Sequence, residues 1–169
     1  MRKNTIKAIL TAGMVFGLAL CTPMEVSAEE SYIRKEYQGY ASEIAEDYGL
    51  DPSLVIAIIE SESSGRRKVV SSAGCIGLMQ ISPKWHTDRM ERLGVEDLED
   101  AYGNILVGCD YLSELCGKYD DVYTVLMCYN EGEYSGAVEK AEQGKHSKYA
   151  EKIVARSKEL KEEKDAGNE

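Results

Sequence analysis

The sequence predicts a mainly α-helical, single-domain protein with at most a small β-hairpin or ordered loop. Apolar residues recur at helical spacing along most of the chain. Pro52 follows an aspartate and Pro83 follows a serine, which is the order of a helix N-cap and a first helical residue. No segment is rich in strand-forming residues, no internal repeat is visible, and 169 residues suit one ordinary domain.

The first 28 residues have the composition of a secretory signal peptide. Arg2, Lys3 and Lys7 give a basic start, Ile9–Leu20 is an uncharged, mainly apolar run, and Val26–Ala28 is a small-residue cleavage pattern. A membrane-spanning helix needs about 20 apolar residues, so an uncleaved membrane anchor is the less favoured alternative. We therefore expect an exported protein that is extracellular or associated with the cell envelope.

The chain is acidic, with 20 basic and 30 acidic residues and a formal net charge of −10. Residues 1–28 hold three of the basic residues and one of the acidic ones, so the remaining chain has 17 basic and 29 acidic residues and a charge of −12. This balance repels phosphates at long range, so we expect no nucleic-acid ligand. Adhesion to anionic lipid or anionic wall polymers is disfavoured for the same reason.

Four cysteines follow the predicted signal peptide: Cys75, Cys109, Cys116 and Cys128. An even number in an exported protein permits up to two disulfides with three connectivities, while small buried thiols are the alternative. Cys109 and Cys116 are separated by about 10 Å of helical rise, which is too far for a bond. If their helix and the next one form an antiparallel hairpin, Cys109 and Cys128 are the first candidates for a pair.

Two helices are predicted at the start of the domain. Residues 32–48 place tyrosines, isoleucines and alanine at helical spacing, and Gly49 provides a stop. Asp51 and Pro52 open the next helix, whose residues 54–59 are apolar almost all round, and such a helix is buried. It ends in a polar run at residues 60–65.

The rest of the chain alternates loops and helices. Residues 66–82 contain several glycines and serines and predict a short hairpin or an ordered loop. Further helices are expected at residues 83–93, 104–118, 121–129, 134–142 and 147 to about 162. We expect the domain to span residues 29–160, and the charged, apolar-poor residues 161–169 to form a disordered tail.

Glu62 is the first candidate for chemistry. It lies at the end of the predicted buried helix and is followed by the loop. Burial beside an apolar wall disfavours the carboxylate, so we expect a raised pKa, as a general acid requires at neutral pH. Glu60 competes with it from another face of the helix, and a solvated glutamate at a frayed helix end is the alternative interpretation.

The segment from Ser71 to Gln80 adds a second candidate. Gly74 and Gly77 allow the backbone to approach a ligand closely. Gln80 offers both a donor and an acceptor, which suit an acetamido group or a sugar hydroxyl. An ordinary turn before a helix is the alternative.

Residues 56–83 closely resemble the lytic transglycosylase (SLT) family, whose catalytic domain is similar to goose-type lysozyme. The family's signature has a glutamate-serine pair at a helix end, a serine-serine-x-glycine turn and a glycine-leucine-methionine-glutamine block. On this pattern the catalytic position falls on Glu62 and not on Glu60, the turn on residues 71–74, and the block on residues 77–80. The resemblance implies a lysozyme-like fold for the helical domain.

Later motifs extend the resemblance to residues 40–155. Asn104–Ile105 is similar to the family's asparagine-isoleucine helix, Tyr129–Gly132 to its tyrosine-asparagine motif, and Tyr149 to the tyrosine that lines the cleft near the acid. Departures include Cys75, Cys128 and Glu131 where small residues are usual. Residues 66–68, Arg-Arg-Lys, replace an aromatic and asparagine-proline segment, and either bring positive charge to the cleft or form a solvated loop.

The resemblance implies cleavage of the β-1,4 bond between N-acetylmuramic acid and N-acetylglucosamine in peptidoglycan, with 1,6-anhydro-muramoyl ends. Glu62 acts first as acid and then as base in this scheme, with no metal and no cofactor. His86 and His146 have no second ligand at metal spacing, and we expect both at the surface. The implied substrate-binding residues are Ser72, Met79, Gln80, Tyr129, Asn130 and Tyr149.

Two other functions stay open. A hydrolytic, goose-type-like lysozyme has the same fold, and a wall-binding assembly protein without turnover can keep it too. The expected partners are peptidoglycan glycan strands, acted on by a monomer. A secretion or conjugation apparatus is a further expected partner by analogy alone.

Overall fold

The computed structural model describes residues 31–166, so the signal peptide predicted for residues 1–28 lies outside the described residues. Within that range the chain folds into seven helices and no sheet, which confirms the predicted mainly α class. None of the described helices is long and apolar enough to cross a membrane. The helices are α1 (Lys35–Asp47), α2 (Pro52–Ser63), α3 (Pro83–Leu93), α4 (Ala101–Lys118), α5 (Val122–Glu131), α6 (Ala137–Glu142) and α7 (Lys148–Ala166).

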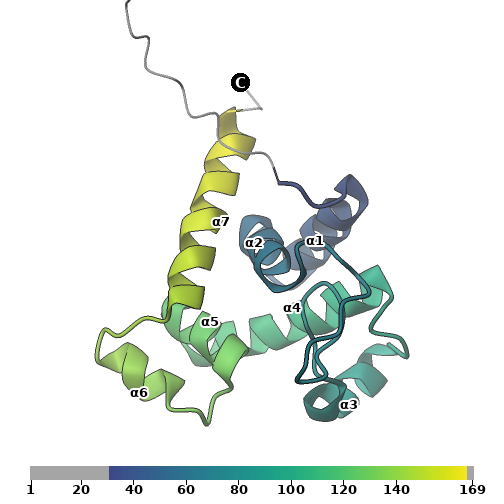
Figure 1. Ribbon diagram of the computed structural model, residues 1–169. Helices are drawn as coiled ribbons and strands as arrows, with labels where there is room; N and C mark the ends of the chain where they lie inside the picture. The colour runs from purple at the N-terminus through teal and green to yellow at the C-terminus, as the bar shows by residue number, and fades with distance from the viewer. Residues whose placement is uncertain (1–30, 167–169) are drawn as a thin grey trace, which may run out of the picture.

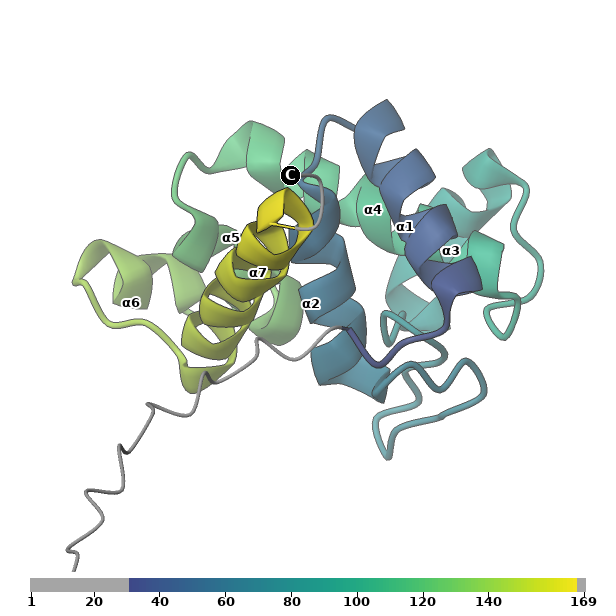
Figure 2. The same cartoon turned by 90° about the horizontal axis from the view of Figure 1, so that it is seen from above.

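Helix α2 is the central element of the fold. It packs against α1 on one side and α7 on the other (Figures 1 and 2). Helix α4 contacts α1, α3 and α5, and α5 contacts α6 and α7. Val55, Ala57, Ile58 and Ile59 of α2 are each 1% exposed or less, because this helix has neighbours on both sides. The prediction of a buried second helix is confirmed.

Local signals fix both ends of α2. The Asp51 carboxylate accepts a hydrogen bond of 2.9 Å from the backbone N–H of Ser53, and Pro52 occupies the first turn. The helix ends where Ser64 (φ 53°) and Gly65 (φ 70°) adopt left-handed conformations. The polar run at residues 60–65 therefore turns the chain out of the core and into the loop.

A buried asparagine holds the loop that follows α2. Residues 69–82 form two isolated antiparallel bridges, Val70 with Ile76 and Ile76 with Ile81, rather than a hairpin of strands. Asn104 Oδ1 accepts from the N–H of Met79 at 2.8 Å, and its Nδ2 donates to the carbonyls of Ile76 and Leu98 at 2.9 Å each. This side chain is fully buried on α4, so the loop is ordered by contact with that helix.

Two predicted helix starts differ from the structure. Helix α4 begins at Ala101, three residues earlier than expected, because the Asp100 carboxylate caps it by accepting from Gly103 N–H at 2.7 Å. Helix α6 begins at Ala137 rather than at residue 134. Gly132 (φ 86°) and Gly136 (φ 81°) both have left-handed backbone, so the residues between them form a turn.

The tail prediction is wrong for residues 161–166, which continue α7. Leu160 is 7% exposed and belongs to the core, which anchors this part of the helix. Lys161 Nζ lies 3.2 Å from an Asp51 carboxylate oxygen, which ties the next turn to the start of α2. Residues 167–169 lie outside the described residues.

All four described cysteines are free, so the suggested bond between Cys109 and Cys128 is wrong. Cys109 and Cys128 are buried, Cys75 is half-buried and Cys116 is exposed. Burial raises the pKa of the Cys109 thiol to about 12. Cys109 and Cys128 therefore serve as small apolar packing groups, which was the alternative interpretation.

A pair of helical glycines tests the packing of α4 against the loop. A Cβ added at Gly108 would meet the Met79 side chain, including its Cε at 2.8 Å, whereas a Cβ added at Gly39 on α1 has nothing within 4 Å. We expect Gly108→Ala to lower the free energy of unfolding by about 1–3 kcal/mol through overpacking. The control Gly39→Ala should raise it by roughly 0.5–1 kcal/mol through helix propensity. Urea unfolding of both variants measures this difference, and equal effects would contradict the packing assignment.

Candidate active site

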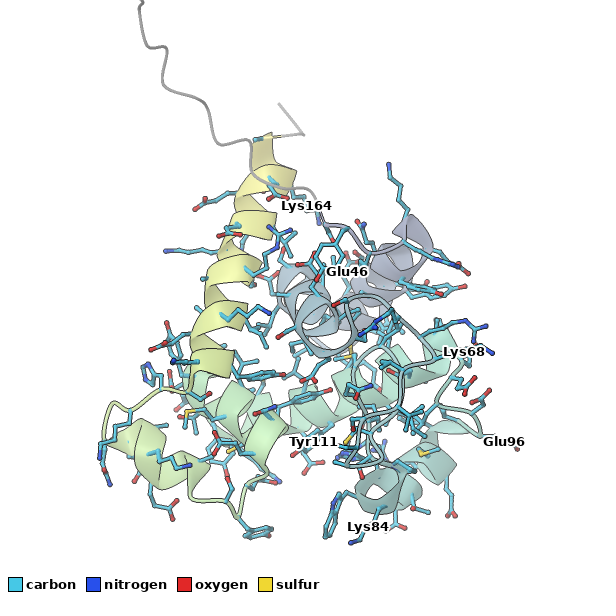
Figure 3. The ribbon with its side chains drawn as sticks, in the orientation of Figure 1. Glu46, Lys68, Lys84, Glu96, Tyr111 and Lys164 are labelled. Carbon is cyan, nitrogen blue, oxygen red and sulfur yellow. The ribbon has the colours of Figure 1, made fainter. Side chains whose placement is uncertain are left out.

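A cleft of about 840 Å³ lies beside the C-terminal end of α2. Its walls come from residues 71–82 of the loop, the first turns of α3, and the segment from the end of α5 to the turn before α6. Figure 3 marks two positions in this region, with Tyr111 inside the molecule and Lys84 of α3 at its lower edge. The lining residues with polar, ionisable or aromatic side chains include Glu62, Gln80, Trp85, His86, Tyr129 and Asn130.

The carboxyl group of Glu62 belongs to this cleft and is half-buried. The Tyr149 hydroxyl, from the first turn of α7, donates to Glu62 Oε1 at 2.5 Å. Burial raises the pKa of Glu62, and this effect outweighs the opposing effects of the Tyr149 hydrogen bond and the Lys152 charge. The carboxyl therefore keeps its proton to a higher pH than an ordinary glutamate.

Glu60 has a different environment. Its carboxylate is 6% exposed and accepts from Arg156 Nε of α7 at 2.8 Å, and it is not among the residues that line the cleft. Residues two apart on a helix are separated by about 200° of rotation, so the two glutamates lie on different faces. Glu60 joins α2 to α7, and Glu62 is the one that a ligand in the cleft can reach.

Two tyrosines flank the Glu62 carboxyl and keep their protons. Burial, and secondly the charge of Glu62, raise the pKa of Tyr149 and of Tyr129 well above the ordinary value. Tyr149 uses its hydroxyl on Glu62, whereas the Tyr129 hydroxyl donates to the backbone carbonyl of Met79 at 3.0 Å. Tyr129 therefore braces the loop beneath the cleft, and Tyr149 orients the Glu62 carboxyl group.

The loop presents the oxygen of Gln80 rather than its amide nitrogen. Gln80 has a left-handed backbone (φ 52°) and lines the cleft. Its Nε2 donates to the carbonyls of Val69 and Gly77, at 3.2 and 3.0 Å. Because an amide has two N–H donors, both are used within the loop, and the side-chain oxygen is the group offered to a ligand as an acceptor.

The remaining predicted site residues lie in three settings. Asn130, at the end of α5, is exposed and lines the cleft. Met79 is fully buried, packs against Gly108, and is part of the support below the cleft. Ser72 is exposed in the turn and is not among the lining residues, whereas its neighbour Ser71 is.

The wall formed by α3 was missed from the sequence. His86 was expected at the surface, but it is half-buried, lines the cleft, and its ring lies 4.7 Å from that of Tyr111. Burial, and secondly the nearby Arg89 guanidinium, lower the pKa of His86, so the ring is neutral near pH 7. The spacing of residues 85, 86 and 89 on one short helix, directly after the Ser82–Pro83 signal, is the pattern that could have indicated this wall.

The second histidine and the basic triplet lie elsewhere. His146 is exposed, as expected, and stacks on Tyr123 with ring centroids 3.9 Å apart. Arg66 donates to the Ser63 carbonyl at 3.0 Å, and Arg67 donates to the Glu99 carbonyl at 2.9 Å. Residues 66–68 do not line the cleft, which favours the surface-loop interpretation. Among residues 31–166 there is no cluster of three or more side chains suited to hold a metal ion.

Known proteins share both the sequence pattern and the fold. The Transglycosylase SLT domain matches residues 39–154. A protein named transglycosylase from Enterobacteria phage PRD1 is 39% identical over 85 residues, which are 50% of this chain and 31% of that protein. An endo-type membrane-bound lytic murein transglycosylase A of Klebsiella pneumoniae is 41% identical over 100 residues, 50% of this chain and 49% of that protein.

Solved structures give the same fold. The 70 kDa soluble lytic transglycosylase of Escherichia coli superposes with a TM-score of 0.62 at 22% identity, over 73% of this chain and 24% of that one. The lytic transglycosylase Slt of Pseudomonas aeruginosa superposes with a TM-score of 0.55 at 21% identity, over 76% of this chain and 21% of that one. At these identities the likeness establishes the fold alone, a mainly α domain shared with these lytic transglycosylases.

The two glutamates of α2 should respond in opposite ways to loss of charge. Because folding raises the pKa of Glu62, the fold favours its protonated form, and stability falls as the pH rises through that range. Glu62→Gln mimics the neutral acid, so it should raise the thermal midpoint by a few degrees at about pH 7 and have little effect at about pH 4.

The matched control is Glu60→Gln, which weakens the buried pair with Arg156 and should cost about 1–3 kcal/mol at neutral pH. Thermal unfolding of both variants provides the readout. Destabilisation by Glu62→Gln at neutral pH would contradict the assigned environment of Glu62.

Proposed function

Since the chain belongs to the SLT transglycosylase family, we propose that it is a peptidoglycan lytic transglycosylase with Glu62 as its single catalytic carboxyl group. The resemblance stated from the sequence is thereby confirmed at the level of the family. The chain spans 31% of the phage PRD1 transglycosylase and 49% of the Klebsiella transglycosylase A, so the support for its activity and substrate comes from its own site. The observation that carries the proposal is the half-buried Glu62 carboxyl, bonded to Tyr149 within the cleft.

The first step is general acid catalysis. Glu62 donates its proton to the glycosidic oxygen between N-acetylmuramic acid and N-acetylglucosamine, and the bond from that oxygen to the muramoyl anomeric carbon breaks. The raised pKa of Glu62 supports this step, because it increases the protonated fraction near neutral pH. The muramoyl acetamido oxygen stabilises the positive charge that develops at the anomeric carbon.

The second step returns the proton. Glu62, now a carboxylate, removes the proton from the muramoyl 6-hydroxyl, and that oxygen bonds to the anomeric carbon to close a 1,6-anhydro ring. Glu62 ends as the carboxylic acid, and no water is consumed. The Tyr149 hydroxyl supports the first step, since its hydrogen bond stabilises the carboxylate that remains after Glu62 gives up its proton.

A single carboxylate suits this cleft because the other lining glutamates are engaged. Glu131 accepts from Lys140 Nζ at 2.8 Å, and Glu133 accepts from both Lys118 and Tyr119. A two-carboxylate glycosidase needs a second free carboxylate facing the bond. Assistance by the substrate's own acetamido group removes that requirement.

Other cleft residues are proposed to hold the sugars. The Gln80 side-chain oxygen can accept from a sugar hydroxyl or an acetamido N–H, and Asn130 can donate and accept at the opposite wall. Tyr129 and Met79 support the loop from below. Ser72 can reach substrate only beyond the edge of the cleft, so its proposed role is secondary.

We also propose that the protein is exported and acts as a monomer on glycan strands in the cell envelope. The signal-peptide pattern of residues 1–28 supports export. Relatives named membrane-bound lytic murein transglycosylase C in Haemophilus species support an envelope location. Opening the wall for a secretion or conjugation apparatus is an extension by analogy.

Digestion of purified peptidoglycan tests the reaction. The parental protein should release muropeptides with 1,6-anhydro-muramoyl ends, identified by mass spectrometry. Glu62→Gln should release none while unfolding at least at the parental temperature. Reducing muramic acid ends would identify a hydrolase instead, and absence of products from the parental protein would favour a wall-binding role.

The pH dependence tests the role of Tyr149. Cleavage needs protonated Glu62, so its rate should fall as the pH rises through the pKa of that carboxyl. The Tyr149 hydrogen bond lowers this pKa, so Tyr149→Phe should shift the falling limb to higher pH as well as slow the reaction. Tyr123→Phe, a tyrosine stacked on His146 outside the cleft, should leave the profile unchanged. If the rate of Tyr149→Phe falls over the same pH range as that of the parental protein, the hydrogen bond from Tyr149 does not set the pKa of Glu62, and its assigned role is wrong.

A further inference from the structure

Two highly exposed aromatic side chains line the same cleft as Glu62. Trp85 on α3 is 75% exposed, and Tyr134 in the turn between α5 and α6 is 103% exposed. They are the two most exposed large hydrophobic residues in the described part of the chain. Figure 1 shows their elements on two sides of the lower edge of the molecule, α3 on one side and the α5–α6 turn on the other.

A kink in α3 accounts for the position of Trp85. His86 has non-helical backbone angles (φ −121°, ψ 18°), and its ring packs against Tyr111. Trp85, the residue before it, is left exposed on the cleft, with the Lys84 ammonium 4.7 Å from its ring centroid. The indole is therefore displayed by a defined backbone conformation rather than by a frayed helix end.

A braced turn accounts for the position of Tyr134. Gly132 and Gly136 give left-handed backbone on both sides of it, and the Ser135 hydroxyl donates to the Gly132 carbonyl at 2.8 Å. The preceding residue, Glu133, accepts from Lys118 and from Tyr119, at 3.1 and 3.0 Å, which fixes the base of the turn on α4. Tyr134 thus stands at the tip of a turn that is anchored to the core.

We propose that Trp85 and Tyr134 are stacking platforms for two sugar rings of a peptidoglycan strand that lies along the cleft, an inference that rests on the proposed function. A pyranose presents polarised C–H groups on its faces, which match the negative face of an aromatic ring, and hydroxyls around its edge. Ser82, Asn130 and Glu131 line the same cleft and offer polar groups that suit those edges. A protein partner would instead need a larger contiguous apolar patch.

The platforms also predict a dependence of binding on strand length. Each ring that stacks adds affinity away from the bond that breaks, so a strand that reaches both platforms should bind more tightly than one that reaches neither. Lys84 places a positive charge over the ring of one platform, 4.7 Å from its centroid, in a protein whose net charge is negative. Carboxylates of the muramoyl lactyl group or stem peptide are the groups that such a charge attracts.

The chain has one tryptophan, so tryptophan fluorescence, excited where tyrosine does not absorb, reports on Trp85 alone. Glu62→Gln, which should not turn over, is titrated with uncrosslinked peptidoglycan strands and with a soluble chitin oligosaccharide. We expect a saturable change in Trp85 emission. In the Glu62→Gln background, a second substitution Tyr134→Ala should weaken binding about tenfold. Trp85→Ala in the same background removes the fluorophore, so its binding is measured by calorimetry, and the same loss of affinity is expected. Tyr102→Ala, an exposed tyrosine of α4 outside the cleft, is the matched control and should bind with the starting affinity.

The outcomes separate this inference from the proposed function. If Trp85→Ala and Tyr134→Ala both bind with the starting affinity while the parental protein digests cell walls, the proposal of stacking platforms is wrong and the proposed reaction is unaffected. If both substitutions weaken binding but the parental protein does not digest peptidoglycan, the stacking platforms are supported and the transglycosylase assignment is wrong. Both side chains are exposed, so neither variant should lower the thermal midpoint.

Discussion

The hydrogen bond from Tyr149 to Glu62 connects residues 87 positions apart and is the contact on which the proposed chemistry depends. It forms only because α7 packs along α2, with the Arg156–Glu60 ion pair and buried Leu160 holding the two helices together. One glutamate of α2 therefore secures the helix that carries Tyr149, while the other receives its hydroxyl. Burial favours the acid form of Glu62 and the tyrosine stabilises the carboxylate, a balance suited to a group that must give up a proton and take one back.

The opposite wall depends on a second buried polar group. Asn104 makes three hydrogen bonds to backbone atoms of the loop and of residue 98, and it does so from a fully buried position where unpaired polar atoms are costly. This fixes a loop that has almost no regular pairing of its own, including the strained left-handed backbone of Gln80. Gln80 can then be held at the cleft without a strand or helix beneath it.

Much of this arrangement could be predicted from the sequence, and the failures have physical causes. Helical spacing with the caps at Asp51 and Ser82 predicted all the described helices, because those signals are local. The choice of Glu62 over Glu60 needed the family motif. The two faces of α2 differ in their contacts with α7, and the sequence of α2 does not show those contacts. Exposure of Trp85 follows from the kink at His86, and α7 continues through residues 161–166 beyond buried Leu160, where Lys161 pairs with Asp51. The spacing on α3 could have indicated a wall of the cleft, but neither the kink nor the contact with Asp51 has a signal in the local sequence.

Direct titration of the Glu62 carboxyl tests the central claim, that this group is a cleft acid whose proton is retained by burial. Carbon-13 NMR of the side-chain carboxyl, assigned by comparison with Glu62→Gln, follows its protonation as a function of pH. The structure predicts a pKa above that of a glutamate in an unstructured peptide. A pKa at or below that ordinary value would show a solvated or ion-paired carboxylate, and would contradict the role of Glu62 as the proton donor.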